Sequence, residues 1–307
     1  MRKDTVTRSF LICAILLMSV TSRAPSQSVV HDETQDEIVV TGVRPGAEPI
    51  RNQAIAFVRM VSARPVDGQI ARWHVPVCPN VKGLSTQHAA IVVQSVKQIA
   101  RTAGAETGGA TCRPNIVITF TSKASGLMKL LLKRQPSVFS QVDRDDRSEL
   151  IDSDRAVRWW YSTNTEGSDG RQISTSSAAL LNSPDFPAPR SGKFLDSYHS
   201  TLIGTKINVN LRSVGVVVDV DTASGSTLSS LSSYIAMVAL APAKLRADYS
   251  DLPSVLAMFS PREISHLRVL TEWDRAYLSS VYKVPTDRTS KEQRSLIAKQ
   301  IIKQIDK

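Results

Sequence analysis

The sequence predicts an α+β protein, a single domain in which helices flank a mixed β-sheet. Three observations favour this class. Segments with helical spacing and segments with alternating spacing follow one another in the first half of the chain, strand patterns then cluster, and no internal repeat or second domain is evident. At 307 residues, with 42% hydrophobic and 21% charged residues, the chain has the composition of a globular protein rather than a collagen-like, low-complexity or disordered one.

The first 28 residues predict a signal peptide. Arg2, Lys3 and Arg8 precede an uninterrupted run of 11 apolar or small residues, Phe10 to Val20. A membrane-spanning helix needs about 20 apolar residues, and no run in the chain reaches that length, so we expect a protein that does not span a membrane. Small residues after the run predict cleavage after Ser28. A buried N-terminal helix is the alternative, but the run has no amphipathic face. We therefore expect a periplasmic or secreted protein.

Residues 29–49 predict a flexible N-terminal arm. They are polar, contain two prolines and include one short apolar run, Ile38, Val39 and Val40. Such a segment buries too little apolar surface to offset the entropy of ordering, although its apolar run is β-prone. We expect the arm to be disordered alone and to add Ile38–Val40 as a strand to a periplasmic or envelope partner. A tether without a partner is the alternative.

Residues 50–307 are predicted to form the globular domain. The clearest element of its first half is a long helix, because Ser85 is a good N-cap, one face is apolar and Gly104 supplies a stop. The predicted elements are, in order, a helix over 50–62, a strand over 73–77, the helix that starts at Ser85, a strand over 115–121 and a helix over 125–134.

Strand patterns dominate the next part of the chain. Val157, Trp159 and Tyr161 share one face of a strand, and the almost wholly β-branched run 214–220 is typical of a strand in the middle of a sheet. The other predicted elements are, in order, a returning strand over 171–177, a long loop over 178–200, a strand over 205–212, a buried helix over 228–241 and two helices whose capping boxes begin at Thr271 and Thr289.

Two segments are rich in charged residues, and we interpret both as structural. Residues 143–154 mix acidic side chains with arginines, which predicts a solvated mixed-charge segment rather than a calcium loop, because the required glycine is missing. Residues 283–307 predict a basic amphipathic helix docked on the domain, with contact to a membrane surface as the alternative.

The charge and the cysteines take their meaning from the predicted export. The formal net charge is +10, which outside the cytoplasm favours an anionic membrane or cell-wall surface, and we expect no nucleic-acid partner. Removal of the leader leaves two cysteines, Cys78 and Cys112. An even number of cysteines in an oxidising compartment predicts one disulfide, with two buried free thiols as the alternative.

Familiar catalytic and cofactor motifs are missing from the sequence. The five histidines are scattered singly, and neither a zinc motif, a Gly-x-Ser-x-Gly elbow nor a phosphate loop is present. Ser280 and Lys283 match Ser-x-x-Lys without its companion motifs, so we interpret the match as coincidence. We assign no catalytic residue and expect no metal or cofactor.

The best chemical candidate is the pair Asp219 and Asp221, at the end of the predicted central strand. The run from Asp219 to Thr222 resembles the Asp-x-Asp-x-Thr signature of haloacid-dehalogenase-like phosphatases, in which two aspartates flank a Mg²⁺ site. Here the threonine comes one position early. The alternative interpretation is that both aspartates cap the following turn and helix.

Two further resemblances are present. The segment Glu37 to Arg44 resembles the segment near the N-terminus of TonB-dependent outer-membrane receptors, where an extended strand is offered to the energy-transducing partner. It covers eight residues, so it implies strand addition and not the receptor function. Segments at 73–78, 112–116, 217–219, 234–240, 253–256 and 270–278 resemble a family of exported Gram-negative proteins of unknown function.

The order of helix, loop and Leu-Thr-x-x-Asp helix also resembles a family of secreted zinc peptidases. In that family the helix matching Tyr234–Leu240 bears Glu and His, and here it bears neither. This resemblance implies a descendant without the peptidase site. We therefore expect an exported envelope protein with a non-catalytic accessory or interaction role. The alternative is a hydrolase, either a degenerate peptidase-like enzyme or one centred on Asp219 and Asp221. The sequence leaves the oligomeric state open.

Overall fold

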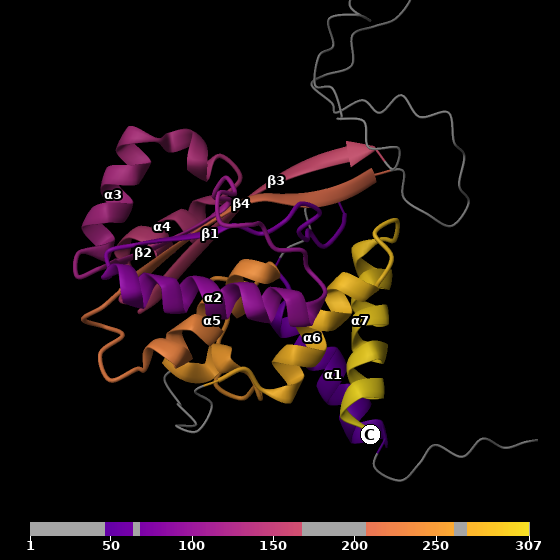
Figure 1. Cartoon of the computed structure of the whole chain (residues 1–307). Coiled ribbons are helices and arrows are strands. Elements are labelled where there is room, and N and C mark those ends of the chain that lie inside the picture. Colours follow the sequence, from indigo (N-terminus) through magenta and orange to yellow (C-terminus); the bar gives the residue numbers. More distant parts are fainter. Residues whose placement is uncertain (1–46, 64–67, 168–206, 261–268, 307) are drawn as a thin grey trace, which may run out of the picture. The chain divides into compact units, whose positions relative to one another are not determined.

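The computed structural model of the chain describes residues 47–63, 68–167, 207–260 and 269–306 (Figure 1). These residues form seven α-helices, two short 3-10 helices (η1 and η3) and four strands. In chain order they are α1 (Ala47–Val61), β1 (Pro79–Lys82), α2 (Thr86–Ala103), β2 (Ile116–Thr121), α3 (Ala124–Arg134), η1 (Pro136–Phe139), α4 (Arg144–Asp152), β3 (Val157–Gly167), β4 (Ile207–Asp219), α5 (Leu228–Leu240), η3 (Val255–Phe259), α6 (Glu272–Lys283) and α7 (Ser290–Ile305).

The four strands form one mixed sheet in the order β1-β2-β4-β3. β1, β2 and β4 are parallel, and β3 is antiparallel to β4. The sheet lies among the helices, so the predicted α+β class with a mixed, helix-flanked sheet in a single domain is confirmed. None of the helices in the described part of the chain is long and apolar enough to cross a membrane.

The two faces of the sheet differ in chemistry. Alternation along β3 directs Val157, Trp159 and Tyr161 to one face and Arg158 and Trp160 to the other. The first face, here called the α5 face, is covered by α5 and α2, which pack together on one side of the sheet in Figure 1. The second, here called the α3 face, is covered by α3, α4 and η1. It is the more polar of the two.

A glycine in β4 makes room for an indole ring on the α3 face. Gly215 lies directly opposite Trp160 in the β3–β4 register, and a Cβ at Gly215 would lie 2.1 Å from the Trp160 ring. The indole also contacts Phe139 of η1, with ring centroids 5.0 Å apart. This close approach requires glycine at that position.

Helix α5 is the centre of the core. Every residue from Ser230 to Leu240 is buried, as its apolar sequence predicts. The last carbonyls of a helix have no partner inside the helix, and burial makes that expensive. Here aromatic side chains supply the donors. The bonds are Tyr161 Oη to the Val238 carbonyl (2.7 Å), Trp73 Nε1 to the Ala239 carbonyl (2.8 Å) and Tyr282 Oη to the Leu240 carbonyl (2.6 Å).

Cys78 and Cys112 form a disulfide. Their Sγ atoms are 1.97 Å apart and their Cα atoms 6.0 Å apart. The predicted pairing is therefore present in the structure. The bond ties the residue before β1 to the loop that leads into β2, next to the exposed end of the sheet.

Four side-chain amides satisfy backbone groups outside the helices and the strand ladders, and two of them, Gln69 and Gln141, do so along the edges of β4 and β3. Each accepts from one backbone N–H and donates to backbone carbonyl oxygen, Gln293 to two carbonyls and the others to one; they are Gln69, Asn115, Gln141 and Gln293. Gln69 Nε2 donates to the Ile207 carbonyl (2.8 Å), and its Oε1 accepts from the Val209 N–H (3.1 Å). This pair of bonds completes β4 where it extends past the end of β2. At these positions the polar backbone is thus satisfied without a further strand.

The predicted strand over 73–77 is wrong. Arg72 and Val77 form only isolated bridges, to Asn210 and Thr107, and the strand of the sheet is β1, which follows at Pro79. The alternation at Trp73 and Val77 reflects side chains that are buried for other reasons. Pro76 cannot donate to a ladder, and Trp73 is directed to α5 by its bond to the Ala239 carbonyl.

The predicted strands over 205–212 and 214–220 form one strand, β4. Between Ser213 and Leu211 the register to β3 shifts, which leaves Arg212 as an extra residue in a β-bulge. The bulge explains why the apolar positions change from odd numbers (Val209, Leu211) to even numbers (Val214 onward). Both sets lie on the α5 face, because one extra residue reverses the alternation.

The acidic segment contains a helix that the sequence interpretation missed. Residues 144–152 form α4, and Asp143 caps it by accepting from the Asp146 N–H (2.7 Å). The mixed charges obscured a single buried apolar residue, Leu150. At the start of the domain, α1 begins at Ala47, three residues before the predicted boundary at residue 50.

The other predicted helices are present with their signals. Ser85 caps α2 and Gly104 ends it in the left-handed conformation (φ 97°). Both capping boxes, at Thr271 and Thr289, are formed. The predicted signal peptide (1–28), the segment Ile38–Val40, the strand over 171–177 and the loop over 178–200 lie outside the described residues.

Candidate functional site

A large hollow lies at the carboxyl end of β4. Its volume is about 910 Å³, and we call it the carboxyl-end pocket. It is lined by the end of α4, the start of β3, the turn 222–226, the first half of α5, the segment 246–249 and η3. Ligands of open α/β sheets bind at the carboxyl ends of strands, so the position is that of a binding site.

One wall of the pocket carries an unpaired hydroxyl. Ser153 Oγ is buried, and it has no hydrogen-bond partner among the described residues. Buried hydroxyls are normally bonded, so this oxygen marks a wall whose hydrogen bonds the fold leaves incomplete; because the oxygen is covered, a group in the pocket reaches it only when the wall moves. The turn after β4 adds Ser224, Gly225 and Ser226 to the opposite wall.

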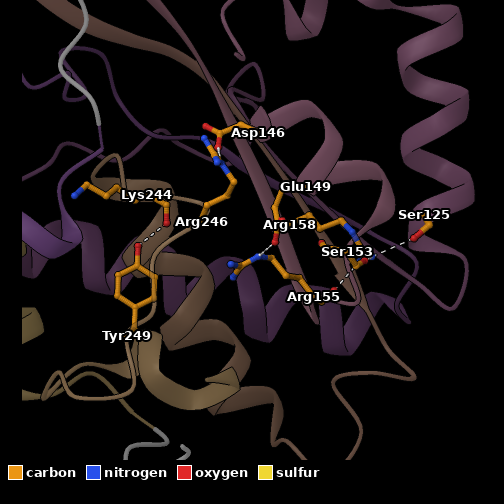
Figure 2. A network of polar contacts seen from close by, with 9 residues as sticks. All are labelled: Ser125, Asp146, Glu149, Ser153, Arg155, Arg158, Lys244, Arg246 and Tyr249. Atoms are coloured by element: carbon orange, nitrogen blue, oxygen red, sulfur yellow. Dashed lines mark hydrogen bonds and ion pairs between the residues drawn. The ribbon is translucent and has the colours of Figure 1, made fainter. Parts of the chain in front are cut away.

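The two arginines that line the pocket are already paired with carboxylates of α4. Arg155 Nε lies 2.5 Å from Glu149 Oε1, and Arg246 Nε lies 2.7 Å from Asp146 Oδ1 (Figure 2). Arg246 Nη2 also lies 3.3 Å from Asp145 Oδ2. Figure 2 shows that the two arginines come from different segments and that each points to a carboxylate of α4. These ion pairs fix the mouth of the pocket, and two further carboxylates, those of Asp154 and Asp248, also line it.

Two tyrosines form the inner wall. Burial raises the pKa of Tyr234 and that of Tyr249, so both phenols stay protonated at physiological pH. Tyr249 Oη donates to the Lys244 carbonyl (2.5 Å), which fixes its ring (Figure 2). Neither phenol is prepared to act as a base. The rings instead offer apolar surface, together with Met258 and Phe259.

A buried cation lies behind the Ser153 wall. Arg158 is 2% exposed and donates from Nη1 to the Arg155 carbonyl (2.8 Å) and from Nη2 to Ser125 Oγ (3.1 Å). Nη2 also donates to the Ser153 carbonyl. Burial lowers the pKa of Arg158, and the nearby Asp219 carboxylate opposes that shift. Its Nε has no partner among the described residues, so the buried charge is incompletely satisfied.

The two aspartates singled out by the sequence do not converge. Asp219 Oδ1 accepts from the backbone N–H groups of Asp221 (3.2 Å) and Thr222 (3.3 Å), and Oδ2 lies 4.0 Å from Arg158 Nη1. Asp221 is exposed. This is the geometry of a carboxylate that closes a turn, so the capping interpretation holds for Asp219 and the turn, whereas the N-cap of the following helix α5 is Thr227. Within the described residues, no group of three His, Cys, Asp or Glu side chains could hold a metal ion.

Known proteins add no further information about this site. No protein-family model, curated protein or solved structure matches the chain.

Sequence reasoning found the end of β4 but not the groups that make the pocket. Ser153, Arg155 and Arg158 lie in one short stretch, 153–158, but nothing in that sequence indicates that it meets Arg246, which follows α5. One signal was present. If Val157, Trp159 and Tyr161 face a core, alternation directs Arg158 to the other face of a buried sheet, and a buried arginine indicates a specific environment.

Proposed function

We propose that this protein is an exported, non-catalytic binding protein of the cell envelope. Its carboxyl-end pocket holds a polar group of a ligand or partner. The observation that carries this proposal is the unpaired Ser153 hydroxyl in the wall of a pocket whose two arginines, Arg155 and Arg246, are already paired with carboxylates of α4. Such a wall can recognise a ligand, but it presents no nucleophile beside a base.

Two observations support the cellular setting of the proposal. The Cys78–Cys112 disulfide fits an oxidising compartment, and the N-terminal sequence has the features of a signal peptide. The segment Ile38–Val40 remains a candidate strand for an envelope partner, on the strength of its sequence alone.

Site-specific photo-cross-linking in cells tests the binding role. A photoreactive phenylalanine analogue is placed at Ser224, on the exposed rim of the pocket, and in a control chain at Ile91, which is 45% exposed on α2. We expect an adduct of defined mass from position 224 and none from position 91. The adduct should weaken in a Ser153→Ala chain. That chain should fold normally, because Ser153 Oγ makes no internal hydrogen bond.

Two results would contradict the proposal. Intact mass spectrometry that finds the chain in the cytosol with Met1 retained would refute export. Hydrolysis of a peptide, ester or phosphate ester by the purified chain, abolished by Ser153→Ala or Asp219→Asn, would show that the pocket is catalytic.

A further inference from the structure

The outer edge of β3 faces a second hollow. Its volume is about 600 Å³, and we call it the edge groove. One wall is formed by residues 141–143 before α4, and the other by Ala63, Ala71 and the segment 242–245. Arg246 lines both the edge groove and the carboxyl-end pocket, so the two hollows meet at this side chain.

The floor of the edge groove carries unpaired backbone groups. The Ala156 carbonyl accepts from the Asp219 N–H (2.8 Å), so this pair of opposite residues is a hydrogen-bonded pair of the antiparallel β3–β4 ladder. Hydrogen-bonded pairs alternate along such a ladder, so the even-numbered residues of β3 bond to β4. Trp159 and Tyr161 therefore direct their N–H and C=O groups away from β4. Among the described residues, no hydrogen bond reaches these outward backbone groups of Trp159 or Tyr161.

The next outward position of the same edge is already occupied by an amide. Gln141 Oε1 accepts from the Thr163 N–H (2.6 Å), and Gln141 Nε2 donates to the Thr163 carbonyl (2.9 Å). A neighbouring strand would make the same two bonds with its peptide groups. The Gln141 side chain therefore shows that an amide fits this edge, and it marks the end of the free stretch.

We infer that the edge groove binds an extended segment of a partner polypeptide, which adds as a strand to β3 at Trp159 and Tyr161. This inference rests on the proposed binding role and names the kind of partner. Alternate side chains of an added strand point to opposite faces of the sheet. In the edge groove one set of these side chains meets the apolar residues Ala63, Ala71 and Pro242, so the partner segment carries apolar residues at every second position.

The Arg246 ion pair controls the width of the site. Arg246 reaches from the segment after α5 to Asp146 on α4, and its side chain is 37% exposed. Exposed ion pairs contribute little to stability, so this contact can open when a strand enters. The partner segment then continues from the edge groove toward the carboxyl-end pocket.

The first test selects peptides and scans their backbone. A library of random linear 12-residue peptides displayed on phage is selected against the immobilised full chain. Each selected peptide is resynthesised with single N-methyl groups that remove one backbone N–H at a time. Every second N-methyl group should weaken binding about tenfold, and the intervening ones should leave it unchanged, because only alternate peptide groups face β3.

Hydrogen exchange and two variants locate the binding. A bound peptide should slow exchange at the Trp159 and Tyr161 amides. Ala63→Trp, which fills the groove, should abolish binding, whereas Gln141→Ala, which frees Thr163, should strengthen it. Thermal unfolding of both variants verifies that they fold.

The inference is overturned by any of three results: no peptide is selected, N-methyl sensitivity lacks the period of two, or binding survives Ala63→Trp unchanged. The cross-link at position 224 is scored separately, so a positive cross-link with no selected peptide would leave the proposed function standing and remove this inference alone.

Discussion

Two buried ionisable side chains, Arg158 of β3 and Asp274 of α6, differ in how completely their surroundings satisfy them with hydrogen bonds. Asp274 of α6 is 0% exposed, and each of its oxygens is bonded. Its Oδ1 accepts from Ser254 Oγ (2.5 Å), and its Oδ2 accepts from the N–H groups of Val255 (2.8 Å) and Thr271 (3.0 Å). Arg158 has its nearest carboxylate at 4.0 Å and an Nε without a partner among the described residues.

The difference distinguishes a buried side chain that holds the framework together from one that lies beside the proposed binding pocket. Asp274 joins the start of η3 to the N-cap of α6, so its complete set of bonds makes it part of the framework. Arg158 lies behind the wall of the carboxyl-end pocket, where satisfaction is incomplete. A buried polar group that the fold leaves partly unsatisfied indicates a place where a ligand or a water completes the set. The following experiments test this contrast.

The largest effect is expected at Asp274. Asp274→Ala removes the acceptors of three buried donors, and we expect a loss of about 3–5 kcal/mol in the free energy of unfolding. Asp274→Asn is the matched control, because its amide oxygen can still accept from Val255 and Thr271, and it should cost about 1–2 kcal/mol. Urea denaturation followed by circular dichroism measures both. Equal losses in the two variants would mean that the bonds are not the source of the stability.

Arg158 should be more tolerant of an apolar replacement. Arg158→Met removes hydrogen bonds but also removes a buried charge that lacks a close counter-ion, so we expect a loss of about 1–2 kcal/mol. Arg158→Lys keeps the charge without the planar fork and should be no more stable than the Met variant. If the Met variant loses as much stability as Asp274→Ala, the contrast between the two charges is wrong.

The pH dependence of stability should also report on Asp274. Burial raises the pKa of Asp274, and the bonds from Ser254, Val255 and Thr271 only partly offset that shift. The folded state therefore holds this proton more tightly than the unfolded state. The stabilisation is complete below the ordinary pKa of 3.8 and is lost as the pH rises through the folded-state pKa.

Paired denaturation curves isolate this contribution. Across the acidic range above pH 3.8, the stability of the unchanged chain relative to Asp274→Asn should fall by at most about 1.4 kcal/mol per pH unit. A difference that grows in the opposite direction would show that the folded state favours the ionised carboxylate.

The smallest effect is expected at Asp219. Asp219→Ala removes the acceptor that closes the turn after β4 and should cost about 1 kcal/mol, whereas Asp219→Asn keeps an acceptor and should cost less. Calorimetric titration of the unchanged chain with Mg²⁺ should show no binding that depends on Asp219. Micromolar binding that disappears in the Asn variant would return the site to the phosphatase-like interpretation.

The fold was predictable where a local signal and the tertiary structure agree. The caps of α2, α6 and α7 and the all-apolar run of α5 are examples, because each depends on residues within one or two turns. Two elements, β1 and α4, were not predicted from the sequence. Four residues are too few to show a period, and the charges of α4 obscured one buried leucine.

The site was predictable only in its position. The end of a β-branched strand indicates a binding edge, but the pocket itself is built by side chains 100 residues apart in the sequence, such as Asp146 and Arg246. Long-range pairing of this kind depends on topology, which composition and spacing do not encode. The bonds from Gln141 to Thr163, at the end of the edge groove, likewise join two elements and have no local sequence signal.

The four amides that complete the backbone of this fold have a consequence for mutational tolerance. Exchange of an amide for the acid of the same shape is ordinarily among the mildest substitutions at a protein surface. At Gln69 it would replace a donor by a second acceptor facing the Ile207 carbonyl, and the same conflict arises wherever one of these amides meets a carbonyl. Asn115 and Gln293 are in this position as well. A saturation-mutagenesis map of the chain should therefore mark these polar positions by their intolerance of the isosteric acid, whether they are exposed or buried.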